Sequence, residues 1–337
     1  MGTRVYKFGG TSVGSPDRIR TVMDLVAAEP ADVTRLVVVS AFGGVTDDLI
    51  GAMDTALRRS GSHADQVEAV RRRHESVVRE LVAAEQQDAV LAEIGHLFRD
   101  LGELLDGIYL LRECTSRTRD AIMGVGERAS APIIAAAMRT RGMPAVALDA
   151  RTMIRTDDAF GEANVDFAET ATLTQAAIDE LPSGTVAVVT GFIASTDSGV
   201  QTTLGRSGSD YTATILGGAL KAEKVIIWTD VDGVLSADPR LVPAAFTLPA
   251  LSYREAGEMA YFGAKVLHPR TMRPLLDDAI PLEIKNTLNP AAAGTRIHAE
   301  SVASEGAVKA VTAVRDIALI MVEGAGMVGV PGISGRT

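Results

Sequence analysis

The chain has 337 residues, 47% of them hydrophobic and 23% charged, which is enough for one large globular domain or two smaller ones. Its net charge of −10 excludes a basic surface for nucleic acid or an anionic membrane, so a polyanionic ligand must meet a few local cations. One cysteine, Cys114, and five histidines provide neither an internal disulfide nor a zinc or iron–sulfur pattern. Since no signal-like or membrane-spanning segment is found, the sequence predicts a cytoplasmic protein.

Short β-branched runs alternate with Ala- and Leu-rich segments of helical spacing. The predicted strands are residues 4–8, 34–40, 144–148, 185–192, 224–229 and 282–286. Because these runs are apolar on both faces, we expect an α/β fold in which helices cover a mostly parallel sheet. Ligands of such sheets bind at the carboxyl ends of the strands. Four turn-rich segments follow predicted strands and should meet at that edge: KFGGTS, SAFGGVT, TGF and TDVDGV.

The first of these segments combines a lysine, Lys7, with the glycines Gly9 and Gly10 and the hydroxyls of Thr11 and Ser12. Glycines let a ligand approach the backbone closely, and a cation beside hydroxyls favours an anion. An ordinary strand-to-helix turn that needs positive φ would use similar residues. This segment alone leaves both interpretations open.

Between residues 62 and 119 the pattern changes to long amphipathic helices, with apolar residues three and four apart. We expect a helical excursion that packs on the sheet domain. The run 71–73 consists of three arginines and is interpreted as a solvated helix face, because acidic residues surround it. His63, His74 and His96 have no partners at metal-ligand spacing and are expected to be surface or packing residues.

Two further segments carry candidate ligand contacts. Glu127 follows two glycines near a predicted helix start, either as a surface glutamate that compensates the helix dipole or as a partner for an ammonium group. The segment TTLGRSGSDYTA places a glycine-rich turn before a helix that is expected to begin near Asp210 or Tyr211. Backbone amides there, with Arg206, favour an anion site over the alternative that Ser209 or Asp210 only caps the helix.

The segment TDVDGV places Asp230 and Asp232 at a strand end, where carboxylates hold Mg²⁺ or a ribose, although an Asp-Gly turn needs no ligand. Lys265 is a candidate phosphate contact, because a lysine near a helix start is unfavourable unless an anion compensates it. Residues 324–329, GAGMVG, match the dinucleotide fingerprint formally. The chain ends before the helix and strand that this fingerprint requires, so we do not expect dinucleotide binding.

Seven segments, taken together and in order, resemble the aspartate kinases of the amino-acid kinase family: KFGGTS, VVSAFGGVTD, GERAS, TTLGRSGSDYTA, TDVDGVLSADPR, FGAKVLHPRT and KNTLNPAAAGT. The resemblance implies a three-layer αβα catalytic domain over residues 1–298 and the start of an ACT regulatory domain over residues 299–337. That second domain is incomplete, as expected if the chain is truncated or borrows its completion from a partner. The helical excursion resembles the subclass with large catalytic domains, including fusions to homoserine dehydrogenase.

The activity implied by the resemblance is phosphoryl transfer from ATP to the side-chain carboxylate of L-aspartate, the first step toward lysine, threonine and methionine. Mg²⁺ would be carried mainly by the ATP phosphates, without a metal site on the protein, and the intact protein would be a homodimer or a higher homo-oligomer. A kinase for another amino-acid carboxylate and a non-catalytic regulatory subunit remain open as alternatives. The presence of Lys7, Asp210 and Lys265 argues against the second alternative.

The same resemblance assigns roles to individual residues. The implied catalytic residues are Lys7, Asp210 and Lys265. The implied substrate-binding residues are Ser40, Thr46, Glu127, Arg206, Gly208 and Ser209. The implied nucleotide-binding residues are Lys7, Gly9, Gly10, Thr11, Ser12, Thr229, Asp230, Leu235, Arg240 and Lys265. Two positions depart from the family pattern, since Leu235 replaces a frequent tyrosine and Ser207 replaces a usual glycine.

Overall fold

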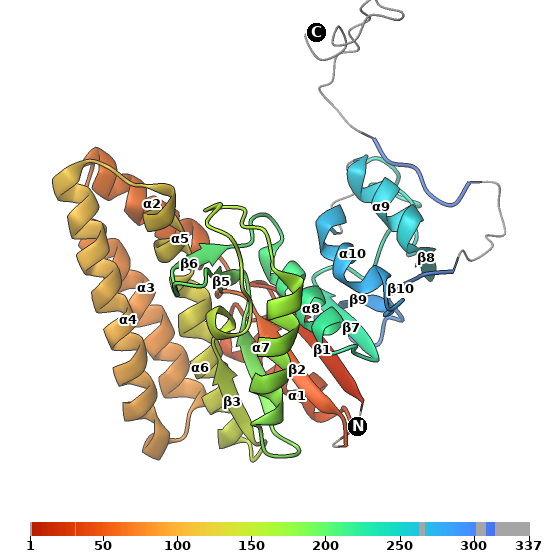
Figure 1. Ribbon diagram of the computed structural model, residues 1–337, viewed down its shortest axis with the longest axis horizontal. Helices are drawn as coiled ribbons and strands as arrows, with labels where there is room; N and C mark the ends of the chain where they lie inside the picture. Colours follow the sequence, from red (N-terminus) through yellow and green to blue (C-terminus); the bar gives the residue numbers. More distant parts are fainter. Residues whose placement is uncertain (1, 31, 263–266, 301–307, 314–337) are drawn as a thin grey trace, which may run out of the picture.

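A computed structural model describes residues 2–30, 32–262, 267–300 and 308–313 of the chain. At its centre lies an eight-stranded sheet with the strand order β3-β4-β2-β1-β7-β9-β10-β8 (Figure 1). The strands of this sheet are β1 (Thr3–Phe8), β2 (Thr34–Val39), β3 (Ala145–Leu148), β4 (Val186–Thr190), β7 (Lys224–Thr229), β8 (Ala250–Ser252), β9 (Leu282–Asn286) and β10 (Thr295–His298).

All six strands predicted from the sequence are present, and they pair in parallel as β3-β4-β2-β1-β7-β9. The mostly parallel sheet is therefore confirmed. Strand β10 runs antiparallel to β9 and parallel to β8, which forms the other edge. The short strands β8 and β10 were not predicted, nor was the two-stranded hairpin of β5 (Ile193–Ser195) and β6 (Gln201–Thr203).

Helices lie on both faces of the sheet and give the three layers expected from the sequence (Figure 1). They are α1 (Pro16–Ala27), α2 (Val45–Arg58), α3 (His63–Leu81), α4 (Ala84–Leu111), α5 (Ser116–Met123), α6 (Val125–Thr140), α7 (Phe167–Asp179), α8 (Gly208–Ala219), α9 (Tyr253–Tyr261) and α10 (Pro269–Leu276), with the 3-10 turn η1 (Ala150–Thr152).

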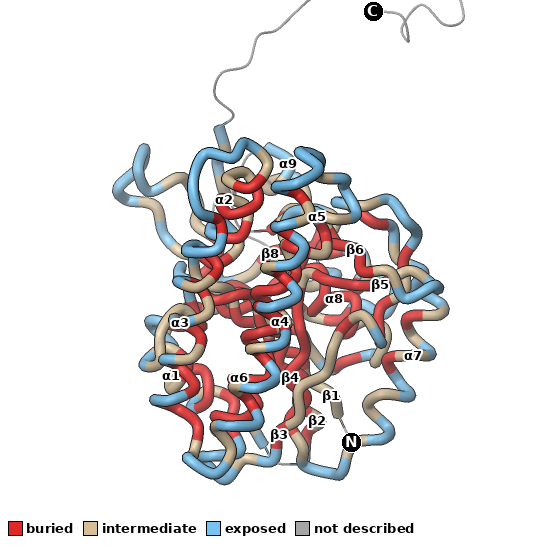
Figure 2. The backbone as a smooth tube through the Cα atoms, turned by 90° about the vertical axis from the view of Figure 1, so that its left-hand side faces the viewer, coloured by how far each residue is buried: buried red, intermediate tan, exposed pale blue. Residues whose placement is uncertain are grey.

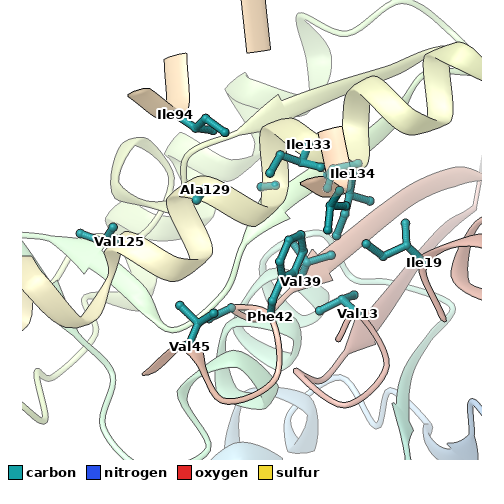
Figure 3. Close-up of a cluster of buried hydrophobic side chains, with 14 of the residues drawn as sticks. Val13, Ile19, Val39, Phe42, Val45, Ile94, Val125, Ala129, Ile133 and Ile134 are labelled. Atoms are coloured by element: carbon teal, nitrogen blue, oxygen red, sulfur yellow. The ribbon is translucent and has the colours of Figure 1, made fainter. Parts of the chain in front are cut away.

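The two helical layers bury opposite faces of the same strands, because successive side chains of a strand alternate between faces. Val37 and Val39 of β2 belong to the hydrophobic cluster that contains α1 and α6, whereas Leu36 and Val38 belong to the cluster with α8. Figure 3 shows Val39 in the first cluster with Ile134 of α6 and other apolar side chains. The central strands are accordingly buried along most of their length (Figure 2, red).

The predicted helical excursion over residues 62–119 contains α3, α4 and the start of α5, and the long helices α3 and α4 lie side by side at one end of the molecule (Figure 1). Arg71 forms ion pairs with Glu68 at 2.7 Å and with Glu75 at 2.6 Å, as expected for a charged helix surface. No helix in the described part of the chain is both long and apolar enough to cross a membrane.

Strand order identifies where a ligand should bind. After β1 the chain moves to β2 on one side of it, and later it reaches β7 on the other side. Such a reversal opens a crevice at the carboxyl ends of the strands. The end of β1, which carries Lys7 and the loop with Gly9 and Gly10, lies at this point.

Candidate active site

A cavity of about 590 Å³ opens at the carboxyl ends of β1, β2 and β4. Three of the four segments expected at one edge contribute to it, namely KFGGTS, SAFGGVT and TGF. The first turns of α2, α6 and α8 also line it. Because the amino-terminal ends of helices carry partial positive charge, three of them around one cavity favour an anionic ligand.

Lys7 projects from the end of β1 into this cavity and forms an ion pair with Asp210 of α8, with 2.6 Å between Nζ and Oδ1. Both side chains are largely shielded, with exposed fractions of 12% and 15%. Partial burial strengthens the attraction between the two charges, so Lys7 is held in one position instead of sampling solvent. Lys7 and Asp210 are 203 positions apart in the sequence, and the fold brings them together.

Glu127, in the first turn of α6, is only 3% exposed and lines the cavity. Its Oε2 atom has no hydrogen-bond partner among the described residues. Burial raises the pKa of Glu127 to about 7, while the backbone of Ala41 and the charge of Lys7 act in the opposite direction. The surface glutamate considered from the sequence is therefore excluded, and a buried carboxylate oxygen is available to a cationic group.

The helix α8 begins at Gly208, two residues before the predicted start, so Gly208, Ser209 and Asp210 form its first turn. The position before it, Ser207, has a φ of 56° and makes no side-chain capping bond. The alternative in which Ser209 or Asp210 caps the helix is therefore wrong. Ser207 occupies the left-handed region that glycine adopts without strain, so the glycine that the family resemblance implies at this position would fit the observed backbone.

Arg206 lies just before this turn, is exposed, and lines the same cavity. It has no ion pair or hydrogen bond with any described residue, so its guanidinium group is available for a bidentate contact with a carboxylate. Ser40 and Thr46 line the cavity from the β2 end and the first turn of α2. The cavity thus contains an available cation, an available carboxylate oxygen and hydroxyl groups.

Two glycine-rich loops touch each other beside the cavity. A Cβ atom added to Gly10 would lie 3.0 Å from the carbonyl oxygen of Ala41 and 3.3 Å from the Cα of Gly43. A side chain at position 10 would therefore press on the backbone of the loop after β2, and a glycine lets the loop after β1 pack closely against it. This contact is a structural reason for the glycines of KFGGTS and SAFGGVT in addition to any ligand.

The residues predicted to bind nucleotide are divided between the cavity and the neighbouring edge of the sheet. Lys7 and Gly10 line the cavity, whereas the other residues of this set that the structure describes do not. Thr229 ends β7, which lies next to β1, and Ser12 contacts Thr287 after β9, with 2.7 Å between the hydroxyl oxygens. Arg240 is 74% exposed and pairs with Asp238, 2.6 Å away. The other described residues of this set, which also lie outside the cavity lining, are Gly9, Thr11, Asp230 and Leu235.

Some predictions lie outside the described residues. Lys265 belongs to the range 263–266, and the GAGMVG loop belongs to the range 314–337. Most of the expected ACT segment over residues 299–337 lies outside as well. The roles inferred for these segments therefore remain predictions.

Sequence reasoning missed several residues that line the cavity: Asp47, Arg119, Asp120, Gly161 and Thr203. Arg119 and Asp120 belong to α5. One residue separates α5 from α6, which has Glu127 in its first turn. The spacing of Asp120, Met123 and Glu127 would place all three on one helical face, and that pattern was available in the sequence. The turn containing Gly161 gave no comparable signal.

Residues 2–286 match the sequence profile described as the Amino acid kinase family. The maize protein named "Bifunctional aspartokinase/homoserine dehydrogenase 1, chloroplastic" is 39% identical over 333 residues, which cover 97% of this chain and 36% of the maize protein. "Aspartokinase 1, chloroplastic" of Arabidopsis thaliana is 38% identical over 300 residues, which cover 88% of this chain and 52% of that protein.

Among solved structures, Escherichia coli aspartokinase III in complex with aspartate and ADP superposes with a TM-score of 0.80 and 34% identity. The match covers 89% of this chain and 65% of the bacterial chain. This chain therefore spans between about a third and two thirds of the length of these relatives.

Proposed function

The chain belongs to the amino acid kinase family, and from that premise we propose that it transfers the γ-phosphoryl group of ATP to the side-chain carboxylate of L-aspartate. A carboxylate oxygen of aspartate forms a bond to the γ-phosphorus, and the bond from that phosphorus to the bridging oxygen breaks. The electron pair leaves with ADP, and 4-phospho-L-aspartate is the other product. Because the attacking carboxylate is ionised at neutral pH, the step needs positioning and charge neutralisation rather than a general base.

The observation that carries the proposal is the presence of Glu127 and Arg206 in one cavity with Lys7. Among the described residues, the buried Glu127 carboxylate forms no ion pair and the Arg206 guanidinium has no partner, and together they match the ammonium and α-carboxylate groups of an amino acid. In this assignment Glu127 binds the ammonium group and Arg206 the α-carboxylate. The hydroxyl groups of Ser40, Thr46 and Ser209 and the backbone of Gly208 complete the substrate contacts.

Lys7 is proposed to neutralise the transferring phosphoryl group, and Asp210 to hold Lys7 in place. The triphosphate would lie over the loop of Gly9, Gly10, Thr11 and Ser12, toward the end of β7. Other proposed nucleotide contacts are Thr229, Asp230, Leu235, Arg240 and Lys265. Mg²⁺ would be carried mainly by the phosphate oxygens, and within the described ranges no group of three His, Cys, Asp or Glu side chains offers a metal site.

Wider features of the protein also belong to the proposal. The catalytic domain would extend over residues 1–298, with the start of an ACT domain over residues 299–337. A cytoplasmic location, a homo-oligomer and fusion or association with homoserine dehydrogenase remain predictions. The proteins that bear both activities in their names support the last of these.

The test is ADP release from ATP and Mg²⁺ in the presence of L-aspartate, L-glutamate or N-acetyl-L-glutamate. We expect turnover with L-aspartate alone. Lys7→Ala should reduce kcat by about 10²–10³-fold, because it removes a preorganised charge at the transferring group. Lys221→Ala is the matched control, since that lysine is 78% exposed and pairs only weakly with Asp278 at 3.8 Å.

Three results would contradict the proposal. Turnover with L-glutamate or N-acetyl-L-glutamate but not L-aspartate would indicate a kinase for another substrate. Binding of L-aspartate without ADP release, or unchanged turnover in Lys7→Ala with retained circular dichroism, would indicate that the cavity does not catalyse this reaction.

A further inference from the structure

Asp120 of α5 lies at the wall of the cavity between the elements that carry Glu127 and Arg206, and none of the roles above is assigned to it. Its side chain is 1% exposed. No lysine, arginine or histidine among the described residues forms an ion pair with it, which distinguishes it from Asp210. A carboxylate in this position must be stabilised by other means, because burying a charge without partners is costly.

Three hydrogen bonds provide that stabilisation. Oδ2 accepts from the backbone N–H of Thr203 and from that of Gly161, each at 2.9 Å. Oδ1 accepts from the hydroxyl group of Thr203, also at 2.9 Å. Bonds to an ionised acceptor are stronger than those between neutral groups. Asp120 therefore joins α5 to β6 and to the loop that contains Gly161.

A second contact runs in the opposite direction between the same elements. Gln201 of β6 donates from Nε2 to the backbone carbonyl of Asp120, with a distance of 2.6 Å. A Cβ atom on Gly124 would lie 2.4 Å from this Nε2 atom, so the glycine makes room for the amide group. Gly124 is also the one residue between the end of α5 and the start of α6.

These contacts involve residues that are close in sequence to the two residues proposed to bind the substrate. Glu127 follows Gly124 by three residues, and Arg206 follows Thr203 by three residues. Ala163, in the loop with Gly161, bonds to Thr203 as well, with 3.0 Å from its backbone N–H to the carbonyl oxygen. The start of α6 and the end of β6 are thus tied to each other on the substrate side of the cavity.

We propose that Asp120 and Gln201 form a clamp of positioning residues that fixes the spacing between Glu127 and Arg206 and thereby determines the affinity for the amino-acid substrate. This inference rests on the proposed function. Both oxygens of Asp120 are occupied by protein donors, so the residue acts through the two ligands instead of binding the substrate itself.

The test compares the KM for L-aspartate with the KM for ATP in two variants. Asp120→Asn removes the negative charge that strengthens these bonds and leaves one acceptor oxygen in place of two. Gln201→Leu removes the opposite bond without altering the Asp120 side chain. Each variant should raise the KM for L-aspartate by about tenfold to a hundredfold, since small displacements of substrate-binding groups have effects of that size. The KM for ATP should stay within about twofold, because the clamp lies away from β7.

Asp166→Asn is the matched control. The Asp166 carboxylate also accepts two backbone N–H bonds, from Ala168 and Glu169 at 3.0 Å, but it caps α7 and does not line the cavity. This control should leave both KM values unchanged. In the double variant Asp120→Asn/Gln201→Leu the KM for L-aspartate should rise less than the product of the single effects, as expected for residues of one unit.

If Asp120 and Gln201 had a purely structural role, the variants would have a lower thermal midpoint of unfolding and a smaller active fraction, but the KM for L-aspartate would not change more than the KM for ATP. That result would overturn the inference. Unchanged KM values for L-aspartate in both variants would overturn it as well. In both cases the wild-type chain still turns over L-aspartate. If the wild-type chain neither binds nor phosphorylates L-aspartate, the proposed function itself fails.

Discussion

At the scale of single residues, Glu127 combines a specific position with an unusual protonation equilibrium. Its carboxyl group is buried in the first turn of α6, and burial raises its pKa from an ordinary 4.5 to about 7. The group therefore changes its charge close to neutral pH. If its ionised form binds the substrate ammonium group, substrate binding must depend on pH in the same range.

We expect kcat/KM for L-aspartate to fall about tenfold for each pH unit below 7, because protonation removes the charge that attracts the ammonium group. In Glu127→Gln, kcat/KM should be low and should lose this dependence. Steady-state rates between pH 5.5 and 8.5 measure both effects. An acidic limb that persists unchanged in Glu127→Gln would show that another group is responsible.

The same residue should affect stability with a defined sign. The folded carboxyl group holds its proton more tightly than the unfolded one, so its contribution to stability is complete below pH 4.5 and is lost as the pH rises through about 7. Glu127→Gln should remove this loss, and urea unfolding of the free protein at several pH values would detect the difference.

At the scale of elements, α3 supports both glycine-rich loops of the site. Arg73 donates to the carbonyl oxygen of Gly14 at 3.1 Å, and the ring of His74 stacks on Phe42, with 4.7 Å between the ring centroids. His74 is fully buried, its Nδ1–H donates to Val70, and its Nε2 atom has no partner within the described residues. Burial lowers the pKa of His74 to about 4.

This histidine should make the protein sensitive to acid. Its neutral form is favoured by folding, so its contribution to stability is present above pH 6.5 and is lost as the pH falls toward 4. The loss amounts to about 2–3 kcal/mol by pH 4.5. His74→Phe keeps the ring on Phe42 and should reduce the fall in the free energy of unfolding between pH 7 and pH 4.5. His96→Phe, at an exposed position of α4, should not.

The elements also show what a sequence can and cannot predict. Strands such as β2 and β4 were predictable because they are apolar on both faces, and the edge where Lys7 and Ser40 lie followed from their parallel order. The predicted start of α8 lay two residues after the observed one, because Ser207 adopts a left-handed conformation that a serine in the sequence does not indicate. The role of Asp120 depends on contacts with residues 41 and 83 positions away, which local pattern does not encode.

At the scale of the whole molecule, the strand order brings the proposed substrate and nucleotide sides to neighbouring strands. The cavity lies over β4, β2 and β1, and the predicted nucleotide residues lie toward β7 and β9. Trp228, the single tryptophan, is near the end of β7 and is 6% exposed. Its ring stacks on Phe8 with 6.0 Å between centroids, and Lys285 lies 5.8 Å above it.

Trp228 should therefore report on the nucleotide side. Titration with ADP and Mg²⁺ should change the tryptophan emission, because charges near Lys285 alter the environment of the indole ring. L-Aspartate alone should produce a smaller change, since the cavity is not lined by β7. Trp228→Phe provides the blank. An emission that responds to L-aspartate but not to ADP would place the nucleotide elsewhere.

The contact between Gly10 and Gly43 couples these two sides. Because backbone meets backbone there, no side chain can rotate away and absorb a movement of either loop. In the proposed kinase, a displacement of one loop by its ligand would move the other loop and change its affinity, and such coupling is reciprocal. If ATP changes the affinity for aspartate by some factor, aspartate must change the affinity for ATP by the same factor, so the proposed catalytic domain would have the means for cooperation between its two proposed substrates within a single chain.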